Sequence, residues 1–343
     1  MIDAEGIDAS ALSAWLDARD LPGQGVDLEI ALLSGGSQNE IFELRRGELH
    51  CALRKPPQSA PASRDAGILR EWRIIEALDG SEVPHTGAVA VCANPAILGR
   101  PFYLMGFIDG WSPMTSAVLP APFDADPAAR AGLAEELIDG IVQMGQFDWI
   151  GRGLSDLGRP DGFHERQVQR WSGFLDGFRG RPLPGYEIAT RWLAERRPID
   201  FLPGLMHGDY QFANVMFGHG SPARMAAIVD WEMGTIGDPK LDLAWALQGW
   251  PEDTTEQGSA FTYIDIRGMP GRGELLSRYA SGSGRQVEDF DYYLVLARWK
   301  LAIVLERGYQ RASGDPRLDS FGPIVLDLMA RAAELAESSD FGR

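Results

Sequence analysis

The chain has 343 residues, of which 45% are hydrophobic, and this is enough to form a large core divided between two lobes. Its formal net charge of −17 argues against nucleic acid or an anionic membrane as a partner, because either would repel such a surface. The longest apolar helical run, residues 292–305, contains Arg298 and Lys300, so we expect no membrane span. Two isolated cysteines, Cys51 and Cys92, and an acidic first segment predict a cytoplasmic protein.

The first third of the chain has the pattern of a small antiparallel sheet with one main helix. A short leading helix is expected at residues 9–19, and the apolar spacing predicts an amphipathic helix at 68–78. Tight turns separate the strand-like segments, which favours pairing between neighbours. The strands are expected at residues 28–33, 40–45, 49–55, 88–92 and 102–107.

The pattern becomes helical from residue 127 onward. Two short strand-like pieces, at 215–217 and 225–229, interrupt the helices. The helices are expected at residues 133–147, 164–178, 187–196, 241–247, 273–281, 289–307 and 322–337. We therefore predict an α+β protein with a sheet lobe at 1–107, a larger helical lobe at 108–343 and a cleft between them.

Polar residues at two places in the second lobe carry the chemistry. The segment HGDYQFAN, residues 207–214, sets Asp209 and Asn214 five positions apart in an apolar frame. Asp230 ends the run AAIV, which predicts a carboxylate at the tip of a buried strand. Asn214 and Asp230 offer hard oxygen ligands that suit Mg²⁺. Asp209 is then available to accept the proton of an attacking hydroxyl.

These motifs, in this order, resemble those of the aminoglycoside phosphotransferase family, small-molecule kinases related to protein kinases. The match consists of HGDxxxxN, then IVDWE at 228–232 and GDPKLDLAW at 237–245. The resemblance implies a protein-kinase-like two-lobed fold with Asp209 as catalytic base. It also implies that Asn214 and Asp230 hold Mg²⁺.

Four further residues of these motifs receive supporting roles or are left with two interpretations. The resemblance implies that His207 and Asp242 support the catalytic loop from behind. Trp231 and Glu232 either contact the substrate or support the metal loop, and both interpretations stay open.

The segment LLSGGSQNEIFEL, residues 32–44, resembles the hairpin that covers the nucleotide in this family. Glycine lets the backbone N–H groups of Gly35 and Gly36 approach phosphate closely, and Ser37 can add a hydroxyl. A plain hairpin turn is the alternative. Ending the first lobe, PFYLMGFIDG resembles the interlobe hinge, in which the backbone around Met105 and Phe107 would bind the adenine edge.

The strand after the hairpin departs from the kinase pattern of an alanine and a lysine two residues apart. The matching tetrapeptide is CALR, so Ala52 and Arg54 share the face toward the cleft, and Lys55 points the opposite way. Arginine can bind phosphate through two parallel hydrogen bonds, which is compatible with nucleotide binding. A bulge in the strand would present Lys55 instead. Glu71 on the adjoining helix is the expected ion-pair partner, with a solvated helix residue as the alternative.

Arginine in place of lysine, with RKPP, GRPFYLM and DWEMGTIGDPKLDLAW, is most similar to one branch of the family. That branch is related to the kinase-like domain of acyl-CoA dehydrogenase fusion proteins and is associated with phosphorylation of hydroxylated acyl-CoA compounds. An acyl-CoA would require a local cluster of basic residues. The candidates are Arg166, Arg170 and the helix bearing Arg298 and Lys300.

The sequence as a whole predicts an enzyme that moves the γ-phosphate of ATP, or of GTP, to a hydroxyl of a small molecule with Mg²⁺. The alternative is a catalytically weak pseudokinase that binds a nucleotide or metabolite, which the arginine at position 54 keeps open. Two further polar residues are expected to have no role in the chemistry. His164 is expected at the surface, and Asp238 in a turn before Pro239.

Overall fold

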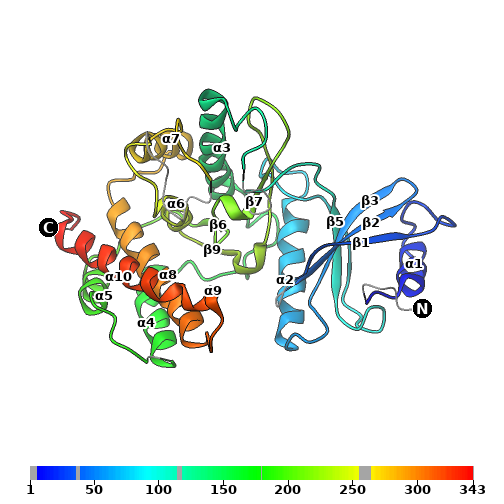
Figure 1. The fold of residues 1–343 in the computed structure, drawn as a ribbon, viewed down its shortest axis with the longest axis horizontal. Helices are drawn as coiled ribbons and strands as arrows, with labels where there is room; N and C mark the ends of the chain where they lie inside the picture. Colours follow the sequence, from blue (N-terminus) through cyan, green and yellow to red (C-terminus); the bar gives the residue numbers. More distant parts are fainter. Residues whose placement is uncertain (1–5, 36–38, 114–117, 179, 255–263, 343) are drawn as a thin grey trace.

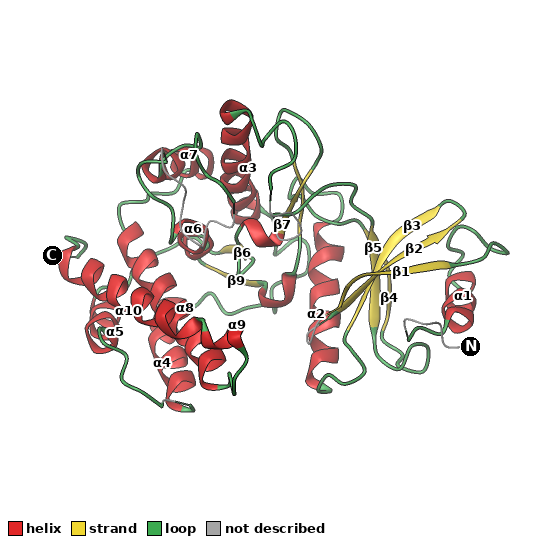
Figure 2. Ribbon diagram, viewed as in Figure 1, coloured by secondary structure: helices red, strands yellow, loops and turns green. Residues whose placement is uncertain are grey.

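The computed structural model describes residues 6–35, 39–113, 118–178, 180–254 and 264–342. Gly36 and Ser37, two of the predicted nucleotide contacts, lie outside the described residues. A sheet lies at one end of the molecule and most of the helices at the other, with α2 (Ser63–Leu78) between them (Figure 1). Figure 2 shows the longer strands gathered at the sheet end. The α+β class predicted from the sequence is confirmed.

The main sheet has five strands in the order β1-β2-β3-β5-β4, each antiparallel to its neighbours. They are β1 (Glu29–Gly35), β2 (Glu40–Arg46), β3 (Leu49–Lys55), β4 (Ala88–Cys92) and β5 (Phe102–Gly106). Because side chains alternate across a sheet, Leu53 and Phe102 pack with α1 (Ala9–Asp17) in one cluster. Arg54 and Tyr103, which are partners in the register, face α2 on the other side.

Helix α2 begins at Ser63, five residues before the start that the apolar spacing predicts. Its first turn is polar, so it gives no periodic signal. That turn is held from outside by Arg100, which pairs with Asp65 at 2.7 Å and donates to the carbonyl oxygens of Pro57 and Ala60. The helix start therefore depends on a contact 35 residues away in the sequence.

The helical region is built around α8, whose residues are mostly buried. Asp126 caps the start of α3 through the N–H groups of Ala128 and Ala129. None of the described helices is long and apolar enough to cross a membrane. The helices are α3 (Pro127–Gln146), α4 (Phe163–Asp176), α5 (Tyr186–Glu195), α6 (Lys240–Leu247), α7 (Arg272–Ser283), α8 (Phe290–Gln310), α9 (Pro316–Asp319) and α10 (Phe321–Ser338).

Two short strand pairs hold the segments that carry the motifs. One pair is β6 (Gly204–Met206) with β9 (Thr235–Gly237), and the other is β7 (Val215–Phe217) with β8 (Met225–Ile228). The two strands of the second pair were predicted from the sequence. Strands β6 and β9 were not, because three residues are too few for an alternating pattern. Two single turns, η1 (Phe212–Asn214) and η2 (Trp231–Met233), lie directly beside them.

The hydrophobic core falls into two clusters. The smaller lies between the main sheet and α1, where the rings of Trp15 and Phe102 meet edge to face at 4.8 Å. The larger cluster is one continuous set of contacts that includes residues of α2, β6, β9 and most of the helices from α3 onward. Since α2 belongs to the larger cluster, it ties the sheet to the segments that carry the polar motifs.

Candidate active site

The segment HGDYQFAN forms the loop after β6 together with η1, and buried polar groups hold it. The N–H groups of His207 and Gly208 donate to the carboxylate of Asp242 at 2.6 and 2.9 Å. Nε2 of the buried His207 lies 2.8 Å from the carbonyl oxygen of Val229. Gly208 has φ +84°, and a Cβ there would lie 2.7 Å from the carbonyl oxygen of Met233, so only glycine fits. Burial raises the pKa of Asp242, an effect that these N–H donors oppose.

Asp209 is held by three side chains. The indole Nε1 of Trp245 donates to Oδ1 at 2.7 Å, and the amide of Gln211 donates to the same oxygen at 3.1 Å. Nδ2 of Asn214 donates to Oδ2 at 2.9 Å and to the Asp209 carbonyl oxygen at 2.8 Å. Because Nδ2 is used in this way, Oδ1 is the atom of Asn214 that can ligate a cation. Trp245 was not among the predicted site residues, although it ends the motif GDPKLDLAW.

Asp230 lies two residues after the end of β8, and its backbone is left-handed, with φ 67° and ψ 57°. This conformation costs a non-glycine residue about 1–2 kcal/mol, and such strain concentrates at functional sites. The N–H of Val229 donates to the carbonyl oxygen of Asn214 at 2.9 Å, which brings the two predicted metal ligands to adjoining chain segments. Carboxylate oxygens of Glu71, Asp230 and Glu232 lie within 4.8 Å of one another. Clustered carboxylate oxygens are ligands that Mg²⁺ prefers.

Arg54 reaches this carboxylate cluster from the sheet. Its Nη2 donates to Oδ1 of Asp230 at 2.6 Å. Its Nε lies 2.9 Å from Oε2 of Glu71 in an ion pair that is not a well-aligned hydrogen bond. The hydroxyl of Tyr103 donates to the same Glu71 oxygen at 3.0 Å. Burial raises the pKa of the Glu71 carboxyl to about 7, although the charge of Arg54 opposes this.

Lys55 lies on the other face of β3. Its Nζ is 2.5 Å from Oε2 of Glu40 and 5.8 Å from the ring centre of Phe42. The register between β2 and β3 is continuous from Glu40↔Lys55 to Arg46↔Leu49. Arg54 is therefore the basic residue of this strand that faces Asp230.

The remaining predicted nucleotide contacts lie in the main sheet or directly after it. Ala52 is buried and pairs in register with Met105. Phe107 follows β5, and its ring stacks on His50 with centroids 4.1 Å apart. Gly35 ends β1, next to the residues that the structure does not describe.

Trp231 and Glu232 differ in their surroundings. Trp231 is 2% exposed, its ring is tilted against that of His207 with centroids 5.0 Å apart, and its Nε1 donates to the carbonyl oxygen of Ile228. It therefore packs behind the loop. Glu232 points to the carboxylate cluster and pairs with Arg64 at 3.0 Å. Burial and the charge of Asp230 raise the pKa of Glu232.

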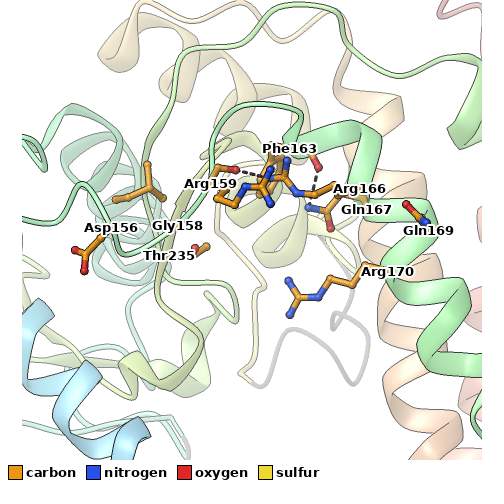
Figure 3. Close-up of a pocket in the computed structure, with 10 residues that line it drawn as sticks. Asp156, Gly158, Arg159, Phe163, Arg166, Gln167, Gln169, Arg170 and Thr235 are labelled. Carbon is orange, nitrogen blue, oxygen red and sulfur yellow. Dashed lines mark hydrogen bonds between the residues drawn. The ribbon is translucent and has the colours of Figure 1, made fainter.

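Two adjoining pockets lie beside the loop that contains Gly208. The inner pocket, of about 230 Å³, has Gly208 and Lys300 in its wall. The outer pocket, of about 540 Å³, shares Phe163, Gln167, Arg170 and Thr235 with the inner one. Figure 3 shows the outer pocket, with the arginines of α4 and the preceding loop around it. Of the predicted basic candidates, Arg166, Arg170 and Lys300 line these pockets, whereas Arg298 donates to the carbonyl oxygen of Gln248.

The surface position expected for His164 is wrong. The side chain is 2% exposed, and Nε2 lies 3.0 Å from Oδ2 of the fully buried Asp238. The hydroxyl of Tyr293 donates to the same oxygen at 2.5 Å. Asp238 also accepts the N–H of Lys240, as a turn residue would. The prediction failed because Asp238 and Tyr293, which contact His164, lie 74 and 129 positions further along the chain. No local sequence pattern indicates such contacts.

A five-stranded antiparallel sheet with one long helix, joined to a helical region that carries the HGDxxxxN loop, is the protein-kinase-like fold. The chain belongs to the aminoglycoside phosphotransferase family: the model described as "Phosphotransferase enzyme family" matches residues 29–275.

Three relatives illustrate this membership. Acyl-CoA dehydrogenase family member 11 of Gallus gallus is 30% identical over 97% of this chain, but the match covers only 44% of that protein. The chain thus spans less than half the length of that relative. Viomycin phosphotransferase of Streptomyces vinaceus is 29% identical over 55% of this chain and 68% of its own. A crystal structure from Ralstonia eutropha, described as a candidate aminoglycoside phosphotransferase, has a TM-score of 0.82 and 25% identity, covering 96% of this chain and 98% of its own.

Proposed function

We propose that the chain transfers the γ-phosphate of ATP, or of GTP, to a hydroxyl of a small molecule. The observation that carries the proposal is the convergence of Arg54, Asp230 and Glu71 at one end of the loop that holds Asp209 and Asn214. Residues 1–107 would bind the nucleotide. Residues 108–343 would supply the catalytic loop, the metal ligands and the acceptor pocket.

Each residue of the site has a task that its surroundings support. Asp209 accepts the proton of the attacking hydroxyl, and Trp245 and Asn214 hold its carboxylate in place. Arg54 binds phosphate oxygens through its planar guanidinium, and Glu71 orients it. Catalysis is then mostly a matter of positioning and charge neutralisation.

The oxygens of Asn214, Asp230 and Glu232 fit a magnesium ion, because they are hard donors that lie on adjoining segments. Bound Mg²⁺ supplies positive charge to the phosphate oxygens. The nucleotide would lie between this cluster and the sheet, with its adenine edge against the backbone at Met105 and Phe107 and its phosphates under Gly35 to Ser37.

For the acceptor, a hydroxylated acyl-CoA is the compound class we put forward. The relatives named as acyl-CoA dehydrogenase family members and the basic residues of the two pockets support it. A pseudokinase is the second candidate, since Arg54 replaces the usual lysine and is tied to two carboxylates.

The variant Asp209→Asn tests the proposal directly. It removes the proton acceptor but keeps the size of the side chain, so ADP formation with a hydroxylated acyl-CoA should fall by about a hundredfold or more. Affinity for Mg²⁺–ATP, measured by calorimetry, should stay within about twofold. A wild-type protein that binds nucleotide but releases no ADP with any hydroxylated acceptor would favour the pseudokinase.

A further inference from the structure

Lys300 is a buried basic side chain that lines the inner pocket. It is 7% exposed and lies on α8, with Nζ 4.7 Å from the ring centre of Trp245 and 5.1 Å from that of Trp171. Among the described residues it makes no hydrogen bond or ion pair. Burying an ammonium group without an acceptor is costly, so such a group points to a ligand that supplies one.

The charge of the pocket walls supports this conclusion. The acidic residues of the two walls are already paired with arginines outside the walls: Glu232 with Arg64 at 3.0 Å and Asp156 with Arg73 at 2.6 Å. The basic residues of the walls are Arg70, Arg159, Arg166, Arg170 and Lys300. A chain with a net charge of −17 thus has a basic pocket beside its catalytic loop.

These basic residues are not equally available to a ligand. Arg70 donates to the carbonyl oxygen of Leu157 at 3.0 Å, and Arg166 donates to the carbonyl oxygens of Arg159 and Asp161. Arg170 differs from them. Its exposed side chain extends from α4 into the pocket (Figure 3), and it has no acceptor among the residues that the structure describes. Arg170 and Lys300 both line the inner pocket, so one ligand there can meet both charges.

The position of Lys300 relative to Asp209 links this pocket to the transfer site. One indole separates the two, because Trp245 faces Lys300 with its ring and donates Nε1 to Asp209. We propose that Lys300 and Arg170 bind an anionic group, a carboxylate or a phosphate, on the same small molecule whose hydroxyl Asp209 faces. The proposal rests on the proposed function and gives its acceptor a charge: a hydroxylated anion. Neutral and cationic alcohols would leave Lys300 without an acceptor.

Lys300 can be observed directly, since Lys55, Lys240 and Lys300 are the only lysines of the chain. Protein labelled with ¹³C and ¹⁵N at lysine would be titrated at constant ionic strength with glycerate and with its neutral amide, glyceramide. A second pair, glycerol phosphate and glycerol, separates a phosphate from a carboxylate. The Lys300 signal should move with glycerate, glycerol phosphate or both, and should stay in place with the two neutral compounds.

The internal controls are the other two lysines, each of which has a carboxylate partner: Lys55 with Glu40 and Lys240 with Asp289. Their signals should not move. Arg170→Gln should weaken the binding seen at Lys300 by about tenfold. Arg298 lies on α8 with Lys300, but it donates to a carbonyl oxygen outside the pocket walls. Arg298→Gln should therefore leave the binding seen at Lys300 unchanged.

A Lys300 signal that ignores both anions would overturn the proposal, and so would one that moves equally with the neutral compounds. Binding of glycerate alone or of glycerol phosphate alone would support the proposal and identify the group. If Lys300 responds as expected while the protein neither binds Mg²⁺–ATP nor forms ADP, the phosphotransferase assignment fails and the anion site stands.

Discussion

At the scale of single residues, the arginine at position 54 determines how the sheet contacts the rest of the site. It bridges Glu71 and Asp230, which come from α2 and from the end of β8, at distances of 2.9 and 2.6 Å. A guanidinium can make both contacts at once because its donors are arranged as a planar fork, whereas a lysine ammonium would act as a point charge. Arginine at position 54 therefore keeps a positive charge where we propose that phosphate binds, and it adds geometric constraint.

The variant Arg54→Met should weaken binding of Mg²⁺–ATP by about tenfold to a hundredfold, because a charge-assisted contact with phosphate is lost. Lys55→Met is the matched control on the same strand. Its side chain pairs with Glu40 on the opposite face, so nucleotide affinity should hold. Calorimetric titration of both variants measures the difference. Equal losses in the two would contradict the role given to Arg54.

Glu71 is expected to make the free energy of unfolding depend on pH. Burial raises the pKa of its carboxyl from 4.5 to about 7. A group whose pKa is higher in the folded state contributes stability that is fully present below the unfolded value and is lost as pH rises through the folded value. Glu71→Gln cannot ionise, so its stability relative to wild type should rise between about pH 4.5 and pH 7.

Urea unfolding of the two proteins across that window measures the effect. Glu76→Gln is the control, since Glu76 lies on the same helix but is exposed, and its difference from wild type should stay flat. A flat difference for Glu71→Gln as well would show that the buried carboxyl does not titrate in this range.

At the scale of elements, the short helix α6 supports the loop that carries Asp209 with two residues one turn apart. Asp242 accepts the N–H groups of the loop, and Trp245, three positions later on the same face, donates to Asp209. Every residue of α6 is buried, so the helix has little freedom to shift. The loop is thus fixed from behind by one rigid element.

Removing the indole N–H of Trp245 should leave the carboxylate of Asp209 less well positioned without changing the binding of the nucleotide. Trp245→Phe keeps most of the ring and deletes the N–H, so kcat should fall by about tenfold while KM for ATP stays unchanged. Trp192→Phe, on the distant α5, is the control. A parallel rise in KM for ATP would indicate that Trp245 acts through the fold and not through Asp209.

The strands of the main sheet could be predicted from the sequence, whereas several shorter elements could not. All five strands of the main sheet form where alternation and glycine turns predict them. The first turn of α2, β6 and β9 were missed, because a polar turn and three-residue strands have no period to detect. Asp209 and Asn214 were predicted to point into one cleft, and Nδ2 of Asn214 donates to Oδ2 of Asp209 at 2.9 Å. The contacts of Trp245 and of His164 depend on the way distant segments fold back, which a single sequence does not reveal.

At the scale of the whole molecule, the net charge of the chain is negative, whereas the walls of the two pockets are basic. The acidic total argues against polyanionic partners, yet the pockets beside the catalytic loop are lined by lysine and arginine. The larger core cluster joins α2 to the helical region, so the carboxylate cluster lies on one continuous framework. A metal ion at Asp230 would therefore lie beside carboxylates of both α2 and η2.

Titration of ATP, with and without Mg²⁺, into wild type and Asp230→Ala tests the central claim most directly. The wild-type protein should bind ATP much more tightly when Mg²⁺ is present, and Asp230→Ala should lose that enhancement because the carboxylate beside Asn214 is gone. Equal enhancement by Mg²⁺ in the two proteins would contradict the account.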